Sequence, residues 1–149
     1  MASIAVKTLT TIGLGLVLVA CSPSAARRDV PAGTDRIVEL SMVGMHFIPD
    51  RIEVKAGELV AFVVTNPNDV AHEVYIGTEA DQMAHHAMHM AVASADQAEI
   101  PHGGYGIFLA PHDTGVVSYR FDTVGEIILG CHLPGHWEAG MKAIVTVEP

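Results

Sequence analysis

The stretch that decides the fold is Cys131-His-Leu-Pro-Gly-His136-Trp-Glu-Ala-Gly-Met141. It carries a thiol, an imidazole and a thioether, each separated from the next by four residues. Predicted strands flank it at 126–129 and 143–147, and the Pro and Gly residues within it supply the bends of a tight loop. Such a loop turns three soft ligands toward one point.

The donor set of this loop predicts a copper site. A thiolate with two imidazoles in one plane and a weak thioether on the axis is typical of type 1 (blue) copper. The second imidazole has to come from elsewhere, and His72 is the candidate because it begins a predicted strand after the turn at 66–69. Zinc fits less well because a thioether is a weak zinc ligand. A binuclear copper centre would need two cysteines in the loop, which holds only one.

Outward from the loop, the chain reads as short strands separated by Gly, Pro and Asn turns, without alternating helices. This pattern favours an all-β, antiparallel Greek-key sandwich. One stretch interrupts it: 79–93 holds helix formers and no Gly or Pro, so a short helical insertion is predicted there, followed by a loop over 96–106. The remaining expected strands lie at 37–40, 52–54, 59–65, 73–76 and 116–121.

These features resemble the cupredoxin family of blue copper proteins. The resemblance is carried by residues 66–77, by 125–147, and by Phe47-x-Pro49-x2-Ile52-x-Val54-x2-Gly57-x2-Val60, which is similar to the opening strands of that family. The Cys-x4-His-x4-Met spacing is similar to that of rusticyanin and auracyanin, whereas plastocyanin and azurin have shorter ligand loops. The resemblance implies one copper ion, held by His72, Cys131, His136 and Met141.

The resemblance implies further roles around the copper. The backbone N–H of Glu73 is expected to donate a hydrogen bond to the thiolate. A redox partner is expected to dock where Leu133, Pro134 and Trp137 surround His136. His132 follows Cys131 directly, so on an extended backbone its side chain points away from the copper. We expect it to face solvent or a second layer rather than to bind the ion.

The predicted helix contains six side chains suited to copper within Met83-Ala-His-His-Ala-Met-His-Met90. On a helix Met83, His86 and Met90 share one face, while His85 and His89 form an i, i+4 pair on another. One interpretation is a second, weaker copper site made from Met83, His85, His86, His89 and Met90. The other is a covering helix with Met83, Met88 and Met90 buried and its histidines incidental. His46, His102 and His112 could contribute to such a site, but nothing in their spacing requires it.

The amino terminus predicts export. Lys7 precedes an apolar run over 12–20, too short to span a bilayer permanently, and the run ends in Leu18-Val-Ala-Cys21. This resembles a bacterial lipobox, in which the cysteine is lipidated. The alternative is cleavage at an ordinary small-residue site. We therefore expect a signal peptide over 1–20, a flexible tether over 21–35 with lipidated Cys21, and a cupredoxin domain over 36–149 facing the periplasm or cell exterior.

Charge and motifs narrow the function classes. A formal net charge of −9 argues against binding nucleic acid, and membrane attachment is expected from the lipid alone. An enzyme is not expected, because copper reductases and oxidases need further domains and His-x-His pairs, which this chain lacks. The predicted function is a one-electron carrier outside the cytoplasm. The alternative is copper sequestration, tolerance or trafficking that uses the blue site and the His/Met helix.

Overall fold

The structure is a computed structural model that describes residues 29–92 and 94–149. The predicted signal peptide and Cys21 lie outside the described residues, so lipidation stays a prediction. The elements, in chain order, are β1 (Arg36–Val43), β2 (His46–Ile48), β3 (Arg51–Lys55), β4 (Glu58–Thr65), β5 (His72–Gly77), α1 (Glu79–Ala91), the 3-10 helix η2 (Ser94–Glu99), β6 (Gly106–Leu109), β7 (Thr114–Phe121), β8 (Gly125–Gly130) and β9 (Lys142–Glu148).

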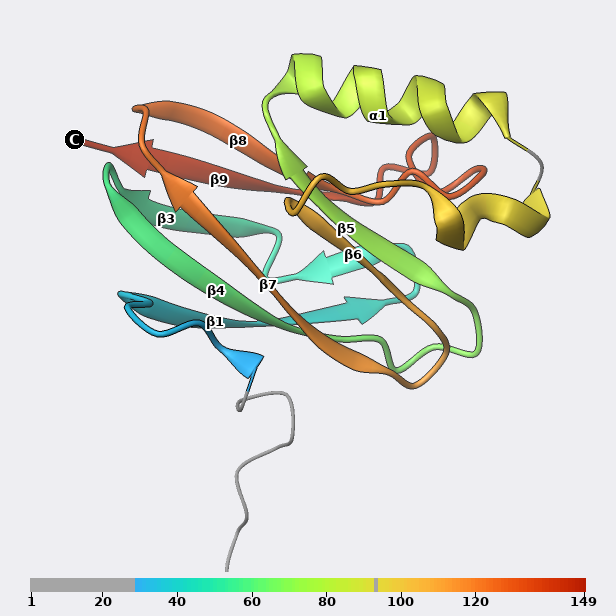
Figure 1. Ribbon diagram of the computed structural model, residues 1–149, viewed down its shortest axis with the longest axis horizontal. Helices are drawn as coiled ribbons and strands as arrows, with labels where there is room; N and C mark the ends of the chain where they lie inside the picture. The colour runs from blue at the N-terminus through green and yellow to red at the C-terminus, as the bar shows by residue number, and fades with distance from the viewer. Residues whose placement is uncertain (1–28, 93) are drawn as a thin grey trace, which may run out of the picture.

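Two sheets form a sandwich, which confirms the predicted all-β class. One sheet has the order β2-β1-β4-β7, and the other has the order β3-β9-β8-β5-β6 (Figure 1). The sheets are mixed rather than wholly antiparallel, because β1 pairs with β4, and β3 with β9, in parallel. The parallel pairs arise because the chain leaves the first sheet after β2, contributes β3 to the second, and returns with β4.

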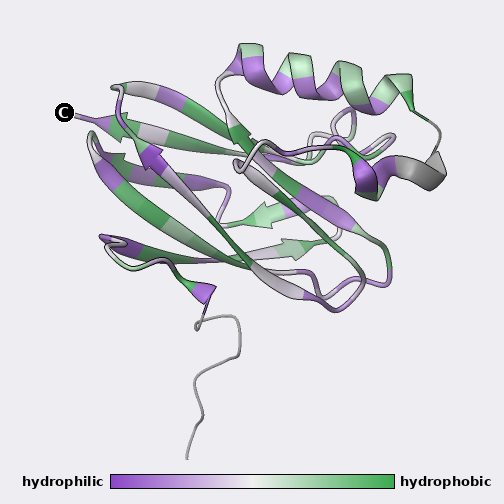
Figure 2. Ribbon diagram, viewed as in Figure 1, coloured by the Kyte–Doolittle hydropathy of each residue, from purple (hydrophilic) through white to green (hydrophobic). Residues whose placement is uncertain are grey.

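The strands pack their apolar faces into one core between the sheets. Strand β4 is buried throughout Val60–Val64, which is the continuous apolar run that the sequence shows. Phe62 lies edge-on to Phe121 of β7, with ring centroids 6.3 Å apart. Figure 2 shows hydrophobic segments alternating with hydrophilic ones along the strands. Large aromatic side chains buried in this way supply much of the driving force for folding.

Two short strands and the short 3-10 helix η2 were not predicted. Strand β2 has only three residues, and β6 has four and follows a glycine-rich loop. The loop expected over 96–106 begins instead with η2. Such short segments show too little periodicity to be recognised from sequence.

Helix α1 is confirmed, but it ends at Ala91 rather than at residue 93, because Val92 adopts an extended conformation. It begins with a capping box: Asp81 N–H donates to the hydroxyl oxygen of Thr78, and Thr78 N–H donates to the Asp81 carboxylate at 2.9 Å. Gln82 then ties the helix to the second sheet by donating to the carbonyls of Tyr75 and Ile128. The helix therefore covers the outer side of β5 and β8 (Figure 1).

The start of the domain is fixed to the sheet. Asp35, the last residue of the predicted tether, donates its N–H to the Leu59 carbonyl at 2.9 Å and accepts from the Leu59 N–H at 2.8 Å. Within the part of the chain that the structure describes, no helix is long and apolar enough to cross a membrane.

Candidate metal centre

Strand alternation brings His72 and Cys131 to the same end of the core. Val74 and Ile76 of β5 point into the sandwich, so His72, two residues earlier, points inward as well. Cys131 follows β8 and shares the inward face with Leu129. Both side chains are completely buried.

The loop between β8 and β9 supplies the other two predicted ligands. His136 N–H donates to the Leu133 carbonyl at 2.9 Å, and Met141 N–H donates to the His136 carbonyl at 3.0 Å. The Cys131 N–H donates to the Met141 carbonyl at 3.2 Å, which closes the loop on itself. These bonds hold His136 at the rim of the sandwich while Met141 is fully buried.

The donor atoms fit a trigonal metal site. The Sγ of Cys131 lies 3.2 Å from the Nδ1 of His136 and 4.0 Å from the Nδ1 of His72. Bonds of about 2.3 Å to sulfur and 2.0 Å to nitrogen at trigonal angles would separate sulfur from nitrogen by about 3.7 Å. The two measured distances lie on either side of that value. All three ligand atoms of His72, Cys131 and His136 lie within 4.8 Å of one another.

Burial prepares these groups for a soft metal. Burial, and then the neighbouring His136, lower the pKa of His72 to about 4, so its ring is neutral and one ring nitrogen keeps a lone pair for a metal. Burial also lowers the pKa of His136. Burial raises the pKa of the Cys131 thiol to about 12, although N–H groups of Glu73 and Leu133 oppose the rise. In the metal-free protein the thiol therefore keeps its proton, which a bound ion displaces.

The expected contact between Glu73 and the thiol is present. Glu73 N–H donates to the Sγ of Cys131 at 3.5 Å.

The predicted docking surface is partly as expected: Pro134 is exposed and His136 and Trp137 are half-buried, but Leu133 is buried. Any partner at this rim would therefore meet Pro134, Trp137 and the edge of His136.

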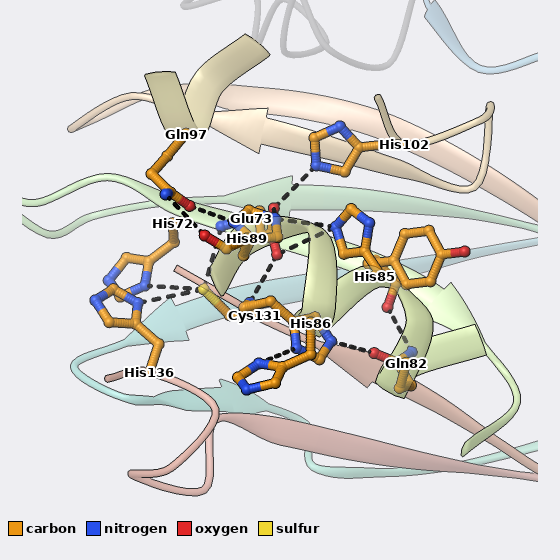
Figure 3. A network of polar contacts seen from close by, with 12 residues as sticks. His72, Glu73, Gln82, His85, His86, His89, Gln97, His102, Cys131 and His136 are labelled. Carbon is orange, nitrogen blue, oxygen red and sulfur yellow. Dashed lines mark hydrogen bonds and ion pairs between the residues drawn. The ribbon is translucent and has the colours of Figure 1, made fainter. Parts of the chain in front are cut away.

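A second group of metal-binding side chains lies on the other face of β5. Glu73 alternates with His72 and so points outward, where α1 covers it completely. The i, i+4 pair on α1, His85 and His89, points down onto this carboxylate, and His102 reaches it from the loop before β6 (Figure 3). Glu73, His85 and His89 offer ligand atoms within 4.8 Å of one another. We call Glu73, His85, His89 and His102 the outer cluster.

The structure divides the predicted secondary site. His85 and His89 are buried, whereas Met83, Met88 and Met90 are 43%, 43% and 50% exposed. The expectation that Met83, Met88 and Met90 are buried is therefore wrong. His86 lies at the margin, with its Nδ1 3.3 Å from the Nδ1 of His132 and its Nε2 3.5 Å from Glu138. Met83 and Met90 are not brought together with His85 and His89.

His132 lies in a second layer rather than in solvent. Its ring is completely buried, stacks on Trp137 at 4.4 Å and lies 2.6 Å from Gln82 Oε1. Burial lowers the pKa of His132 to about 3, so the ring is neutral. Gly130 makes room for this contact, since a Cβ there would lie 2.5 Å from Gln82 Oε1.

Sequence reasoning missed one member of the outer cluster, since Glu73 was considered only for its backbone N–H. His102 was a possible contributor to the second site, but its spacing did not place it there. Alternation along β5 could have indicated that Glu73 faces away from the copper and toward whatever covers the sheet. No sequence signal places His102, which arrives through a loop.

Comparison with known proteins agrees with the site geometry. Residues 36–148 match the family model described as copper binding proteins, plastocyanin/azurin family. Solved structures with the same fold include auracyanin B, with a TM-score of 0.67 and 23% identity over 80% of this chain and 94% of that chain. An auracyanin from Roseiflexus castenholzii has a TM-score of 0.65 and 18% identity, covering 80% of this chain and all of its own.

Two relatives carry the name copper-resistant cuproprotein CopI. The one from Pseudomonas aeruginosa is 29% identical over 144 residues, which cover 79% of each chain. The one from Rubrivivax gelatinosus is 33% identical over 105 residues, which cover 70% of this chain and 61% of the relative.

Proposed function

The chain belongs to the plastocyanin/azurin family of copper-binding proteins. We propose that it binds type 1 copper outside the cytoplasm and that this binding contributes to copper tolerance. The observation that carries the proposal is the buried convergence of His72, Cys131 and His136 in a chain similar to proteins named for copper resistance. Copper tolerance was the second of the two functions that the sequence suggested.

The chain's own residues define what the site does. The three donors close around one point inside a buried core, so water is excluded and the ligands need to move little when the ion changes charge. When bound, the copper supplies one-electron redox chemistry. Glu73 N–H supports the thiolate, and the half-buried ring of His136 connects the site to the surface.

One-electron transfer is the second candidate function, and the rim around His136 favours it. A redox protein docking over Pro134 and Trp137 would approach a copper ligand directly. No substrate is transformed in either proposal. The lipobox-like stretch at 18–21 supports a place at a membrane surface, with the tether giving the domain reach.

The tolerance proposal can be tested in a copper-sensitive bacterial strain. The full chain should raise the copper concentration that stops growth, whereas the Cys131→Ser chain, exported to the same level, should not. Equal protection by the two chains would contradict the proposal, because a chain without the thiolate cannot form the site. His112→Gln is a matched control, because His112 is exposed and its polar contact within the described residues is with Asp69, far in sequence from every proposed ligand.

Electron transfer is measured separately on purified protein. Pro134→Glu places a charge at the rim without removing a ligand. It should slow electron exchange with a redox protein that docks there, while the visible copper–thiolate absorption stays unchanged. An unchanged exchange rate with every redox protein tried would argue against docking at this rim.

A further inference from the structure

We propose that the outer cluster is a second metal site, which binds Cu²⁺ through Glu73, His85, His89 and His102 on the opposite face of β5 from the type 1 centre. The four side chains come from three separate parts of the chain: β5, α1 and the loop before β6 (Figure 3). The proposal concerns a site separate from His72, Cys131 and His136, and does not depend on the function proposed above.

The spacing of Glu73, His85 and His89 is that of ligands around one ion, and His102 contacts the same carboxylate. The Nε2 atoms of His89 and His102 each lie 3.0 Å from Glu73 Oε2. The Nε2 of His85 lies 3.5 Å from Glu73 Oε1 and 3.1 Å from the Nε2 of His89. Ligand atoms about 2.0 to 2.1 Å from a common ion lie about 2.8 to 3.4 Å apart for angles between square and tetrahedral. Each histidine presents the same nitrogen, Nε2, to the same carboxylate.

Gln97 orients His89 for this role. The side-chain amide nitrogen of Gln97 donates to the carbonyls of His89 and Val92, at 3.3 and 3.4 Å. Its oxygen is thereby turned to the Nδ1 of His89, so that this nitrogen carries the hydrogen and donates. The Nε2, which faces Glu73, is then the ring nitrogen left for an ion, and a bound ion would displace the proton that this nitrogen shares with the carboxylate. A hydrogen bond that fixes the second ring nitrogen is the usual support of a metal-binding histidine.

The position of His85 also supports a metal site in the outer cluster. Its ring is completely buried and stacks flat on Tyr75, with centroids 4.0 Å apart. Its Nδ1 has no hydrogen-bond partner among the described residues. Its polar contacts within the described residues are at Nε2, with the Nε2 of His89 and the carboxylate of Glu73. Aromatic stacking, rather than hydrogen bonding, holds this imidazole toward the cluster.

The outer cluster is buried, unlike a chance grouping of side chains on the surface. Glu73, His85 and His89 side chains are 0% exposed, and His102 is 11% exposed. A carboxylate enclosed in this way requires compensation by opposite charge. Glu73 also accepts the His132 N–H at 2.7 Å, which leaves the rest of its oxygens to the three histidines. Because only His102 reaches solvent, it marks the side from which an ion would enter.

The donor set selects the metal. Three imidazoles and a carboxylate contain no sulfur, so they suit a divalent ion better than Cu(I). Among divalent first-row ions, such nitrogen and oxygen donors bind Cu²⁺ most tightly. This choice also separates the two sites chemically, since only the inner site has soft sulfur ligands.

The test counts copper in a chain whose type 1 site is disabled. Full-length Cys131→Ser protein is titrated with Cu²⁺, desalted, and assayed for copper per chain and by electron paramagnetic resonance. We expect one Cu²⁺ per chain with nitrogen hyperfine splitting and no intense visible band. Adding His85→Gln and His89→Gln should remove it, while adding His86→Gln, on the same helix, should not.

Several results would overturn the proposal. These are a Cys131→Ser chain that keeps no copper, equal retention by the His85→Gln/His89→Gln chain, and displacement of the copper by equimolar Zn²⁺. If the double substitution unfolds the chain, the single change His102→Gln serves instead, because His102 lies in a loop. It should weaken Cu²⁺ binding at least tenfold. Unchanged binding in that folded variant would likewise exclude the site.

Discussion

At the scale of single residues, two pairs of adjacent residues, His72–Glu73 and Cys131–His132, place their side chains on opposite faces of one sheet. His72 and Cys131 point into the sandwich and offer a nitrogen and a sulfur to the inner site. Glu73 and His132 point outward, under α1. Since Glu73 N–H also contacts the Cys131 sulfur, one residue touches both places. Strand alternation alone accounts for this division.

The Cys131 thiol predicts how copper affinity depends on pH. With the pKa of Cys131 raised to about 12 and that of His72 lowered to about 4, only the thiol holds a proton near neutrality. Binding should release one proton, so the Kd for Cu²⁺ at the type 1 site should fall about tenfold per pH unit between about pH 6.5 and 9. Competition with a chelator at several pH values measures the slope.

The His85→Gln/His89→Gln chain is the suitable background for that titration, because it reports on the inner site alone. Its slope should match the wild-type slope read from the visible band. A Kd that does not change with pH would mean that the thiol is already ionised in the metal-free protein.

At the scale of elements, α1 is what turns an outward strand face into a buried one. It is short and half polar, so packing and capping rather than propensity hold it in place. Gln82 fixes its first turns to β5 and β8, and Thr78 caps its start. The outer cluster therefore depends on how α1 is seated, whereas the inner site depends on β5 and the loop after β8.

Removing the N-terminal cap of α1 should test whether the inner site is independent of this helix. Thr78→Ala should lower the free energy of unfolding by about 1 kcal/mol, because the Asp81 N–H loses its acceptor. It should leave the visible absorption of the inner copper unchanged. Urea unfolding measures the first effect, with Thr123→Ala as the control at an exposed loop position. A bleached visible band in folded Thr78→Ala protein would show that α1 also supports the inner site.

At the scale of the whole molecule, the inner site joins parts of the chain that are far apart in sequence. His72 opens β5, and the other predicted ligands lie between β8 and β9, on neighbouring strands of one sheet. A bound ion links these segments in the folded state only. It should therefore stabilise the fold by an amount that grows with the logarithm of the ratio of free copper to Kd.

Copper removal should lower the melting temperature. At a free copper concentration a hundred times the Kd, the bound ion adds about 2.7 kcal/mol, which corresponds to about 10 °C in a domain of this size. Scanning calorimetry with and without a chelator measures the difference. In the His85→Gln/His89→Gln background, the Cys131→Ser change should abolish it. A melting temperature unaffected by chelator would contradict a site formed only by folding.

Much of this organisation was predictable from local pattern. The strands 59–65 and 143–147 are long, apolar and bounded by turns, and the structure has β4 and β9 there. The spacing from Cys131 to Met141 predicts that its side chains converge, because a tight loop between two strands allows them few orientations. Short β2 and β6 were missed, since three or four residues carry little periodicity.

The sandwich class, a helix that starts at residue 79 and the residues proposed for the inner copper follow from the sequence, because periodicity and ligand spacing are local properties. Only the tertiary structure decided that two strand pairs run in parallel and that Leu133 is buried. It also decided that the helix turns its histidines inward and its methionines outward. The physical reason is that the face a side chain buries depends on what packs against it, and Glu73, Gln97 and His102 reach α1 from other segments of the chain.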